Sequence, residues 1–303
     1  MSHPGSAWPT LDFPECQSTI ETLHQWIQIV GKIRLRTMPW RNHSWHTTLY
    51  ISKCGFSTHG IPYQGGLFEL EFDFIDHKLH ISSTFAETVS IGLYAMTVAD
   101  FYKELFEKLE DLGIAVTIHG SPNEMEPAIP FHQNTVNSTY TPELAHNLWQ
   151  VMLKVNSVFH QFRTEFIGKV SPVHLFWGAF DLAVTRFSGR PAPLHPGGMP
   201  NMPLDVMQEA YSHEVSSAGF WPGSKDFPTP IFYSYAYPSA ADFGQQKVLP
   251  DAAFFSEDLG EFVLKYEDVI NTPSPEKTLH DFLETTYLAA VNTSAWDEQL
   301  IRK

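Results

Sequence analysis

The sequence predicts an α+β protein built mainly from antiparallel sheets with packed helices. Strict alternation in Phe68–Phe74 places Phe and Leu on one side and carboxylates on the other, which is typical of a half-buried strand. Apolar residues at helical spacing over residues 142–166 predict a long amphipathic helix. Further short strand patterns between these segments favour helices packed on antiparallel sheets.

In the first part of the chain, the expected helix begins at Ser18 and ends at Gly31. Ser18 and Glu21 have the spacing of a capping box, and glycine is a common helix C-cap. The next expected elements are strands at 45–52, 68–74 and 78–81, a helix at 98–109 and a strand at 114–119. Residues 120–140 contain several prolines and little periodicity, which predicts halves at 1–130 and 131–303, with one continuous domain as the alternative.

In the second part, Thr141 and Pro142 predict the N-cap and first residue of a helix that runs through Phe166. The later expected elements are strands at 175–184, 231–237 and 262–266, a helix from Pro203 and a final helix at 275–291. The order helix, Gly-Lys, His, strands and helix occurs in both halves. This order predicts an internal duplication around a shared cleft, with His46 and His174 in equivalent places.

The composition limits the class of protein. A net charge of −15 over 303 residues argues against binding to nucleic acid or to an anionic membrane surface. Two cysteines make no disulfide framework, no segment reaches the ~20 apolar residues of a membrane span, and the N-terminus lacks a signal-peptide pattern. These features predict a soluble cytoplasmic protein with a small-molecule partner, and they leave a homo-oligomer open.

Residues 168–223 are the expected functional region, because titratable side chains occur there among Gly, Pro and aromatic residues, the composition of a small-molecule pocket. The candidate catalytic residues are Asp181, Glu209, His213 and Glu214, and the candidate substrate-binding residues are Arg186, Arg190, His195 and Trp221. His213 is the expected acid, base or metal ligand, with Glu209 or Glu214 as its partner. The two arginines are the expected clamp for a carboxylate or phosphate, and the alternative is that they pair with Asp181 or Glu214 in a structural network. Asp181 interrupts an apolar strand, so its carboxylate should be paired or have a shifted pKa unless that strand face is exposed.

A divalent metal is the one cofactor that the residues suggest. Glu209 and His213 lie four positions apart and would share one face of the helix predicted from Pro203, with His195 as a further ligand. The alternative is a histidine at a helix end paired with its own carboxylate. The second histidine of a zincin motif is replaced by Ser217, and no Gly-x-Ser-x-Gly, phosphate-loop or dinucleotide motif occurs.

Six long runs carry a resemblance to a bacterial family whose domain has no known function. They lie at residues 26–33, 72–77, 171–178, 180–190, 195–198 and 211–223 and span nearly the whole chain. The resemblance implies full-length membership and no established activity, cofactor or catalytic residue.

Three functions are therefore open: an enzyme acting on a small, anionic molecule, a non-catalytic ligand-binding or sensing module, and a structural or assembly protein. The first two require Arg186, His195, His213 and Glu214 to converge on one site. The third requires an exposed apolar patch around Phe220 and Trp221.

Overall fold

The structure, a computed structural model, describes residues 7–297 and 300. Its α-helices are α1 (Phe13–Thr37), α2 (Val98–Asp111), α3 (Pro142–Thr164), α4 (Leu204–Ala210), α5 (Tyr266–Ile270) and α6 (Pro275–Ser294). Its strands are β1 (Tyr50–Ile51), β2 (Gly55–Ser57), β3 (Ile61–Tyr63), β4 (Gly66–Asp73), β5 (Lys78–Ser83), β6 (Val89–Gly92), β7 (His174–Phe176), β8 (Asp181–Pro191), β9 (His213–Trp221), β10 (Ile231–Tyr237), β11 (Phe254–Ser256) and β12 (Glu261–Lys265). Short 3₁₀ helices lie at Asn42–Ser44, Phe131–Gln133 and Phe243–Gln245.

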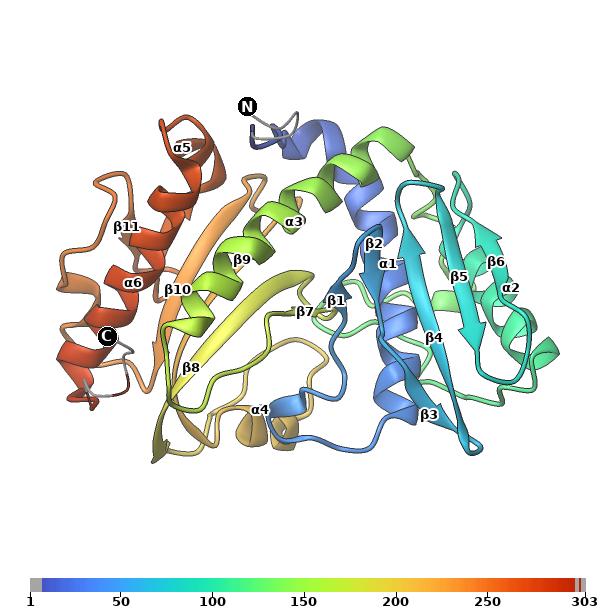
Figure 1. The fold of residues 1–303 in the computed structure, drawn as a ribbon, viewed down its shortest axis with the longest axis horizontal. Coiled ribbons are helices and arrows are strands. Elements are labelled where there is room, and N and C mark those ends of the chain that lie inside the picture. Colours follow the sequence, from blue (N-terminus) through green and yellow to red (C-terminus); the bar gives the residue numbers. More distant parts are fainter. Residues whose placement is uncertain (1–6, 298–299, 301–303) are drawn as a thin grey trace.

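The predicted α+β class is confirmed. All strand pairs are antiparallel, and they form two sheets, each with 6 strands among the described residues. The first sheet has the order β1-β2-β4-β5-β6, with β3 paired to β4, and the second has the order β11-β12-β10-β9-β8-β7. Figure 1 shows α3 crossing one face of the second sheet with α6 beside it, while α1 runs along the first sheet.

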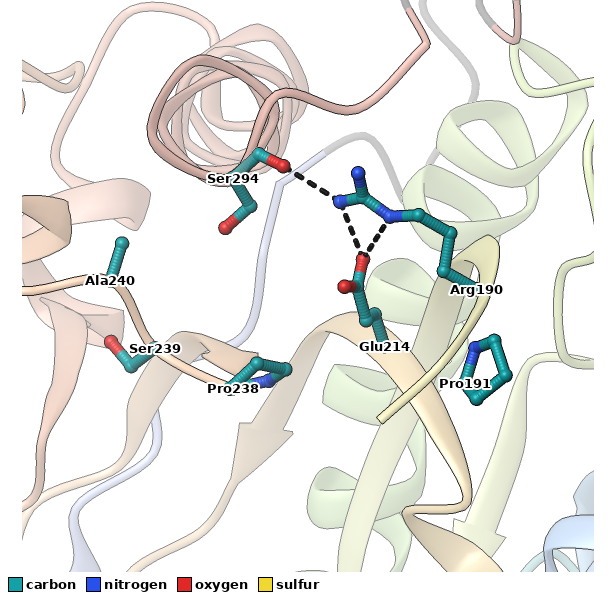
Figure 2. Close-up of a pocket in the computed structure, with 7 residues that line it drawn as sticks. All are labelled: Arg190, Pro191, Glu214, Pro238, Ser239, Ala240 and Ser294. Carbon is teal, nitrogen blue, oxygen red and sulfur yellow. Dashed lines mark hydrogen bonds and ion pairs between the residues drawn. The ribbon is translucent and has the colours of Figure 1, made fainter. Parts of the chain in front are cut away.

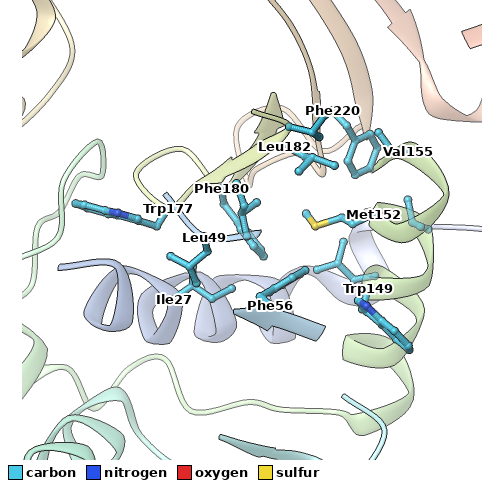
Figure 3. Close-up of a cluster of buried hydrophobic side chains, with 14 of the residues drawn as sticks. Ile27, Leu49, Phe56, Trp149, Met152, Val155, Trp177, Phe180, Leu182 and Phe220 are labelled. Carbon is cyan, nitrogen blue, oxygen red and sulfur yellow. The ribbon is translucent and has the colours of Figure 1, made fainter. Parts of the chain in front are cut away.

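The two sheets meet at one antiparallel bridge between Leu49 and Leu175, whose backbone groups exchange hydrogen bonds of 3.0 and 2.8 Å. A shared hydrophobic core fills this junction (Figure 3). Ile27 of α1, Phe56 of β2 and Met152 of α3 are fully buried there beside Leu182 of β8. This core includes residues from both sides of position 130, and the division of the chain there remains a prediction.

The two faces of the second sheet differ in chemistry because side chains alternate along a strand. On β8, Leu182, Val184 and Arg186 are buried against the side covered by α3 and α6. Asp181 and Thr185 point to the opposite face, away from α3 and α6. That opposite face is the floor of the cavity described below.

Helix α1 is longer than predicted at both ends. Pro14 occupies the first turn, so the helix begins at Phe13, and Ser18 lies inside it, accepting a hydrogen bond from Thr22. Gly31 does not end the helix. A Cβ atom at Gly31 would overlap the indole of Trp177, so the glycine allows close approach of the turn before β8 to α1.

Four other predicted elements are wrong, shortened or divided. Residues 114–119 form no strand, and of the predicted strand at 45–52 only residues 49–51 are paired. A turn divides the predicted strand at 175–184 into β7 and β8. The helix expected from Pro203 ends at Ala210, so His213 begins strand β9 instead of sharing a helix face with Glu209. Both halves have the predicted order of a helix, antiparallel strands and a helix. An internal duplication is not shown by this order and remains a prediction.

Candidate functional site

A cavity of about 1090 Å³ lies against the face of the second sheet that is opposite α3 and α6. Its walls come from the end of α1, from residues 40–47, from the loop at 119–124 and from the segment 199–211 that contains α4. Aromatic side chains make much of the lining, namely Trp40, Trp45, Phe176, Trp177, Phe187, Tyr211, Tyr233 and Tyr235. A cavity with a mainly apolar surface and several convergent polar side chains is the usual form of a small-molecule site.

Hydrogen-bonded polar groups cross the floor of this cavity. The hydroxyl of Tyr233 donates to the carboxylate of Asp181, and the hydroxyls of Thr185 and Ser217 lie 2.8 Å apart. The hydroxyls of Tyr235 and Tyr211 lie 2.7 Å apart. Burial is the main cause that raises the pKa of Tyr233 and of Tyr235 well above the usual value. These phenols therefore stay neutral hydrogen-bonding groups.

Two carboxyl groups, those of Asp181 and Glu124, face the same cavity, and neither is paired with a cationic side chain among the described residues. Burial raises the pKa of Asp181 to about 6, although the hydrogen bond from Tyr233 opposes this rise. Burial, and then the nearby charge of Asp181, raise the pKa of Glu124 to about 7. Of the residues that the structure describes, none forms an ion pair with either carboxylate. The two groups therefore titrate close to neutral pH.

The position of Glu124 depends on a backbone hydrogen bond and on the space left by the glycine at position 178. Its N–H donates to the carbonyl of Pro200 at 3.0 Å, and its φ of 56° lies in the left-handed region. A Cβ atom at Gly178 would overlap the Glu124 carboxylate. Only glycine at position 178 therefore leaves room for this acid beside the turn that leads into β8.

A stripe of polar residues on α1 forms hydrogen bonds with the turn that leads into β8. His24, Gln28 and Lys32 are spaced by four, so they lie on one face of the helix. The Nε2–H of His24 donates to the carbonyls of Trp177 and Gly178 at 2.9 Å each, and Gln28 donates to the carbonyl of Gly178 at 3.1 Å. Burial lowers the pKa of His24 to about 4, so the imidazole is neutral.

Lys32 ends this stripe and lines the cavity. Its Nζ donates to the side-chain oxygen of Asn123 and lies 5.2 Å from the centre of the Trp177 ring. Only 3% of the residue is exposed, and burial lowers its pKa to about 8. Among the described residues that line the cavity, Lys32 is the only lysine or arginine.

His174 lines the cavity from β7 and is only 1% exposed. Neither ring nitrogen has a hydrogen-bond partner among the described residues, and the ring packs at 4.5 Å against Phe176. Burial lowers the pKa of His174 to about 4. His46, its predicted counterpart in the first half, lines the same cavity.

Of the predicted site residues, Asp181 and Glu209 line the cavity. Glu209 accepts the backbone N–H of His43 at 2.8 Å and so connects α4 to the wall at 40–47. His195 lies behind the wall, stacked on Tyr211 with ring centres 4.5 Å apart. Trp221 is outside the lining, with its indole N–H donating to the carbonyl of Ala179 at 3.2 Å.

Arg186 points to the opposite face of the sheet, away from the cavity. It is fully buried, pairs with Glu284 at 2.8 Å and lies over the rings of Phe162 and Tyr287. The prediction that it joins a substrate clamp is therefore not supported by its position, because residues 181 and 186 of one strand face opposite sides. Its contacts are those of a structural ion pair, as in the alternative, but the partner is Glu284 rather than Asp181 or Glu214.

Arg190 and Glu214 lie in a second, shallower hollow of about 440 Å³ (Figure 2). The guanidinium pairs with the carboxylate at 2.7 Å and donates to the carbonyl of Ser294 at 2.7 Å. Cations at a helix C-terminus stabilise its free carbonyls, so Arg190 caps the end of α6. This pairing also matches the structural alternative.

His213 lies at the start of β9, where its Nδ1 is 3.1 Å from the hydroxyl of Ser212 and its ring is 5.9 Å from that of His43. The predicted metal ligands Glu209, His213 and His195 do not form a cluster. Over residues 7–297 and 300, the ligand atoms of one acidic and histidine set lie within 4.8 Å of one another, those of Glu165, His280 and Glu284. In that set, Glu284 is already paired with Arg186.

None of Arg186, His195, His213 and Glu214 is among the residues that line the larger cavity, and their convergence on one site remains a prediction. The cavity brings together Asp181 and four residues outside the predicted catalytic, substrate-binding and metal sets, Glu124, Lys32, His174 and Tyr233. One signal for Lys32 was present in the sequence, because polar residues recur at positions 24, 28 and 32 between the apolar residues Trp26, Ile27, Ile29, Val30 and Ile33. Glu124 lies in a loop without periodicity and carries no such signal.

The helices of the described residues include none that is both long and apolar enough to cross a membrane. No curated protein and no solved structure matches the chain. A family model does match, over residues 8–303, and it is described as a family of unknown function, DUF5996. With nearly its whole length covered by that model, the chain belongs to the DUF5996 family.

Proposed function

We propose that the chain is an enzyme that performs general acid–base chemistry on a small molecule bound in the cavity of about 1090 Å³. Asp181 and Glu124 are the groups that transfer protons. The observation that carries the proposal is this pair of cavity-facing carboxyl groups, which have no cation partner among the described residues and have pKa values of about 6 and about 7. Near neutral pH, one carboxyl can hold a proton while the other accepts one.

The substrate that this cavity favours is small, partly apolar and not strongly anionic. The arginines expected to bind an anion lie outside the lining, whereas Asp205 and Glu209 add carboxylates to the wall. The cavity surface is mainly apolar, with aromatic rings in its lining, and the neutral phenols of Tyr233 and Tyr235 supply hydrogen bonds. We place the enzyme in the cytoplasm, which is supported by the acidic net charge and by two buried, free cysteines.

A non-catalytic ligand-binding or sensing module is the second candidate, favoured by the aromatic lining. An assembly role through Phe220 and Trp221 has no support, because Phe220 is fully buried and Trp221 is partly covered. The position of His213 outside the lining removes the basis for giving it the central acid–base role.

The test is incubation of the protein with a complex mixture of cellular small molecules, followed by mass spectrometry of bound, consumed and newly formed compounds. We expect at least one compound to be consumed by the wild type and to remain intact, although bound, with Asp181→Asn or Glu124→Gln. Glu214→Gln, which changes a carboxylate outside the cavity, should retain turnover. Compounds that bind and remain unchanged with every variant would establish the binding module instead.

A further inference from the structure

The acid–base chemistry proposed for Asp181 and Glu124 does not involve Lys32, although this lysine has an unusual position. Its amine is buried at the cavity wall, where an uncompensated charge is costly. Among the described residues, its polar contact is the neutral side chain of Asn123, and no carboxylate lies within ion-pair distance. The Trp177 ring, 5.2 Å away, covers another side of the amine.

We propose that Lys32 is a nucleophile that forms an imine with a carbonyl compound, an aldehyde or a ketone, bound in the cavity. This inference rests on the proposed function for the cavity and names its substrate class. Three observations carry it: the amine faces the cavity, it lacks an anionic partner among the described residues, and it is buried beside the Trp177 ring. Lysines activated by an apolar site rather than paired with a carboxylate are the usual imine-forming lysines.

The lysine is also held in place. Asn123 accepts from Nζ through its side-chain oxygen and donates through its side-chain nitrogen to the carbonyl of Asn201. The backbone N–H of Asn123 donates to the side-chain oxygen of Gln28 at 2.9 Å. The amine is therefore fixed between α1 and the loop that carries Glu124. The lowered pKa of Lys32, about 8, supports the proposal because a larger fraction of the amine is unprotonated at neutral pH.

The step balances without any oxidant or reductant. The lone pair of neutral Nζ attacks the carbonyl carbon, the carbon–oxygen π bond breaks, and the oxygen takes a proton while the nitrogen loses one, giving a carbinolamine. The carbon–oxygen bond then breaks, and the oxygen leaves as water with a proton from a cavity acid or from solvent. The product is a protonated imine, in which the carbon derived from the carbonyl is bonded to Nζ.

The experiment is reductive trapping on the full chain. The protein is incubated with benzaldehyde, an aldehyde whose ring suits an aromatic cavity, in the presence of cyanoborohydride, which reduces a protonated imine to a stable secondary amine. Peptide mapping by mass spectrometry then locates the benzyl group. We expect labelling of Lys32 to be at least on the order of tenfold faster than labelling of Lys103, because the pKa of Lys32 is lowered to about 8 and each unit of lowered pKa increases the free amine about tenfold.

Lys169 is a matched control. It also has aromatic neighbours, with Nζ 4.9 Å from the Phe187 ring centre, and burial lowers its pKa, but it lies outside the cavity lining. Lys169→Arg should leave the labelling of Lys32 unchanged, whereas Lys32→Arg should remove the fast label. Labelling that is equally fast at Lys32 and Lys103, or fast at Lys169 alone, would overturn the proposal. Both outcomes can be observed with the wild-type protein.

Asp181→Asn separates this proposal from the proposed function. If acid–base catalysis by Asp181 is wrong and Lys32 is the nucleophile, turnover in the small-molecule mixture will not depend on Asp181, while Lys32 is still trapped. If the Lys32 proposal is wrong and the acid–base proposal is right, turnover will depend on Asp181 while Lys32 reacts no faster than Lys103.

Discussion

The hydroxyl of Tyr233 on β10 reaches across β9 to donate a hydrogen bond to the carboxylate of Asp181 on β8. Gly219 of β9 lies beneath it, and a Cβ atom there would overlap the Tyr233 ring and hydroxyl. Glycine at this strand position therefore allows two residues on non-adjacent strands to meet. The contact orients the carboxylate that is central to the proposed chemistry.

Tyr233→Phe should raise the pKa of Asp181 above about 6, because the hydrogen bond from Tyr233 favours the ionised carboxylate. Gly219→Ala should act in the same direction by displacing the phenol. A carbon-13 NMR titration of the aspartate carboxyl carbons measures this shift, with Asp181→Asn assigning the resonance. An unchanged Asp181 titration in Tyr233→Phe would contradict the described contact.

Asp181→Asn should stabilise the fold at alkaline pH. The folded-state pKa of about 6 is above the ordinary value of 3.8, so the folded state binds more protons than the unfolded state between those values. Stability from this group is complete below pH 3.8 and is lost as pH rises through 6. At pH 8 the substitution should add on the order of 1 kcal/mol, and at pH 3.5 it should add little. Thermal unfolding at both pH values, with Glu214→Gln as the control, measures the difference.

His174 should make the fold sensitive to acid. Its folded-state pKa of about 4 is below the ordinary value of 6.5, so the unfolded state binds the proton first as pH falls. Stability should therefore decrease from pH 6.5 to pH 4. His174→Phe should reduce that loss by on the order of 2 kcal/mol, as measured by urea unfolding. The exposed His132→Phe variant should retain the wild-type acid dependence, and an equal loss in all three proteins would refute the assignment.

The ion pairs of Arg186 and Arg190 should contribute differently to the free energy of unfolding. Glu284→Ala leaves the fully buried guanidinium of Arg186 without its carboxylate and should cost about 3–5 kcal/mol. Arg190→Ala removes a pair whose arginine side chain is 47% exposed and should cost about 1 kcal/mol or less. Urea unfolding of the two variants provides the comparison. Equal costs would show that the burial of Arg186 has no energetic consequence.

Metal content should not depend on His213. The candidate ligands Glu209, His213 and His195 are not clustered, whereas Glu165, His280 and Glu284 are, although Arg186 competes for Glu284. Elemental mass spectrometry of protein purified without chelator or histidine tag should give equal metal content for the wild type and His213→Ala. Any bound divalent ion should instead decrease in His280→Ala. Loss of one ion per chain in His213→Ala would restore the predicted metal site.

The local sequence determined most helices and several strands. Alternation in Phe68–Phe74 corresponds to β4, and the apolar stripe of 142–166 corresponds to α3, because each pattern depends only on the repeat of its own element. The same rule separates Asp181 from Arg186, which lie an odd number of positions apart on β8. The boundaries of α1 were misjudged because Ser18 and Gly31 act as caps only where a helix end leaves backbone groups free.

The candidate site itself was decided by the tertiary structure. Asp181 comes from β8, Tyr233 from β10, Lys32 from α1 and Glu124 from an irregular loop, and no sequence pattern relates these distant positions. Their raised or lowered pKa values arise mainly from burial, which exists only after α1, the loop and the second sheet have packed together. The sequence by itself therefore determined the α+β class and the apolar faces, whereas packing decided which polar groups share one cavity away from water.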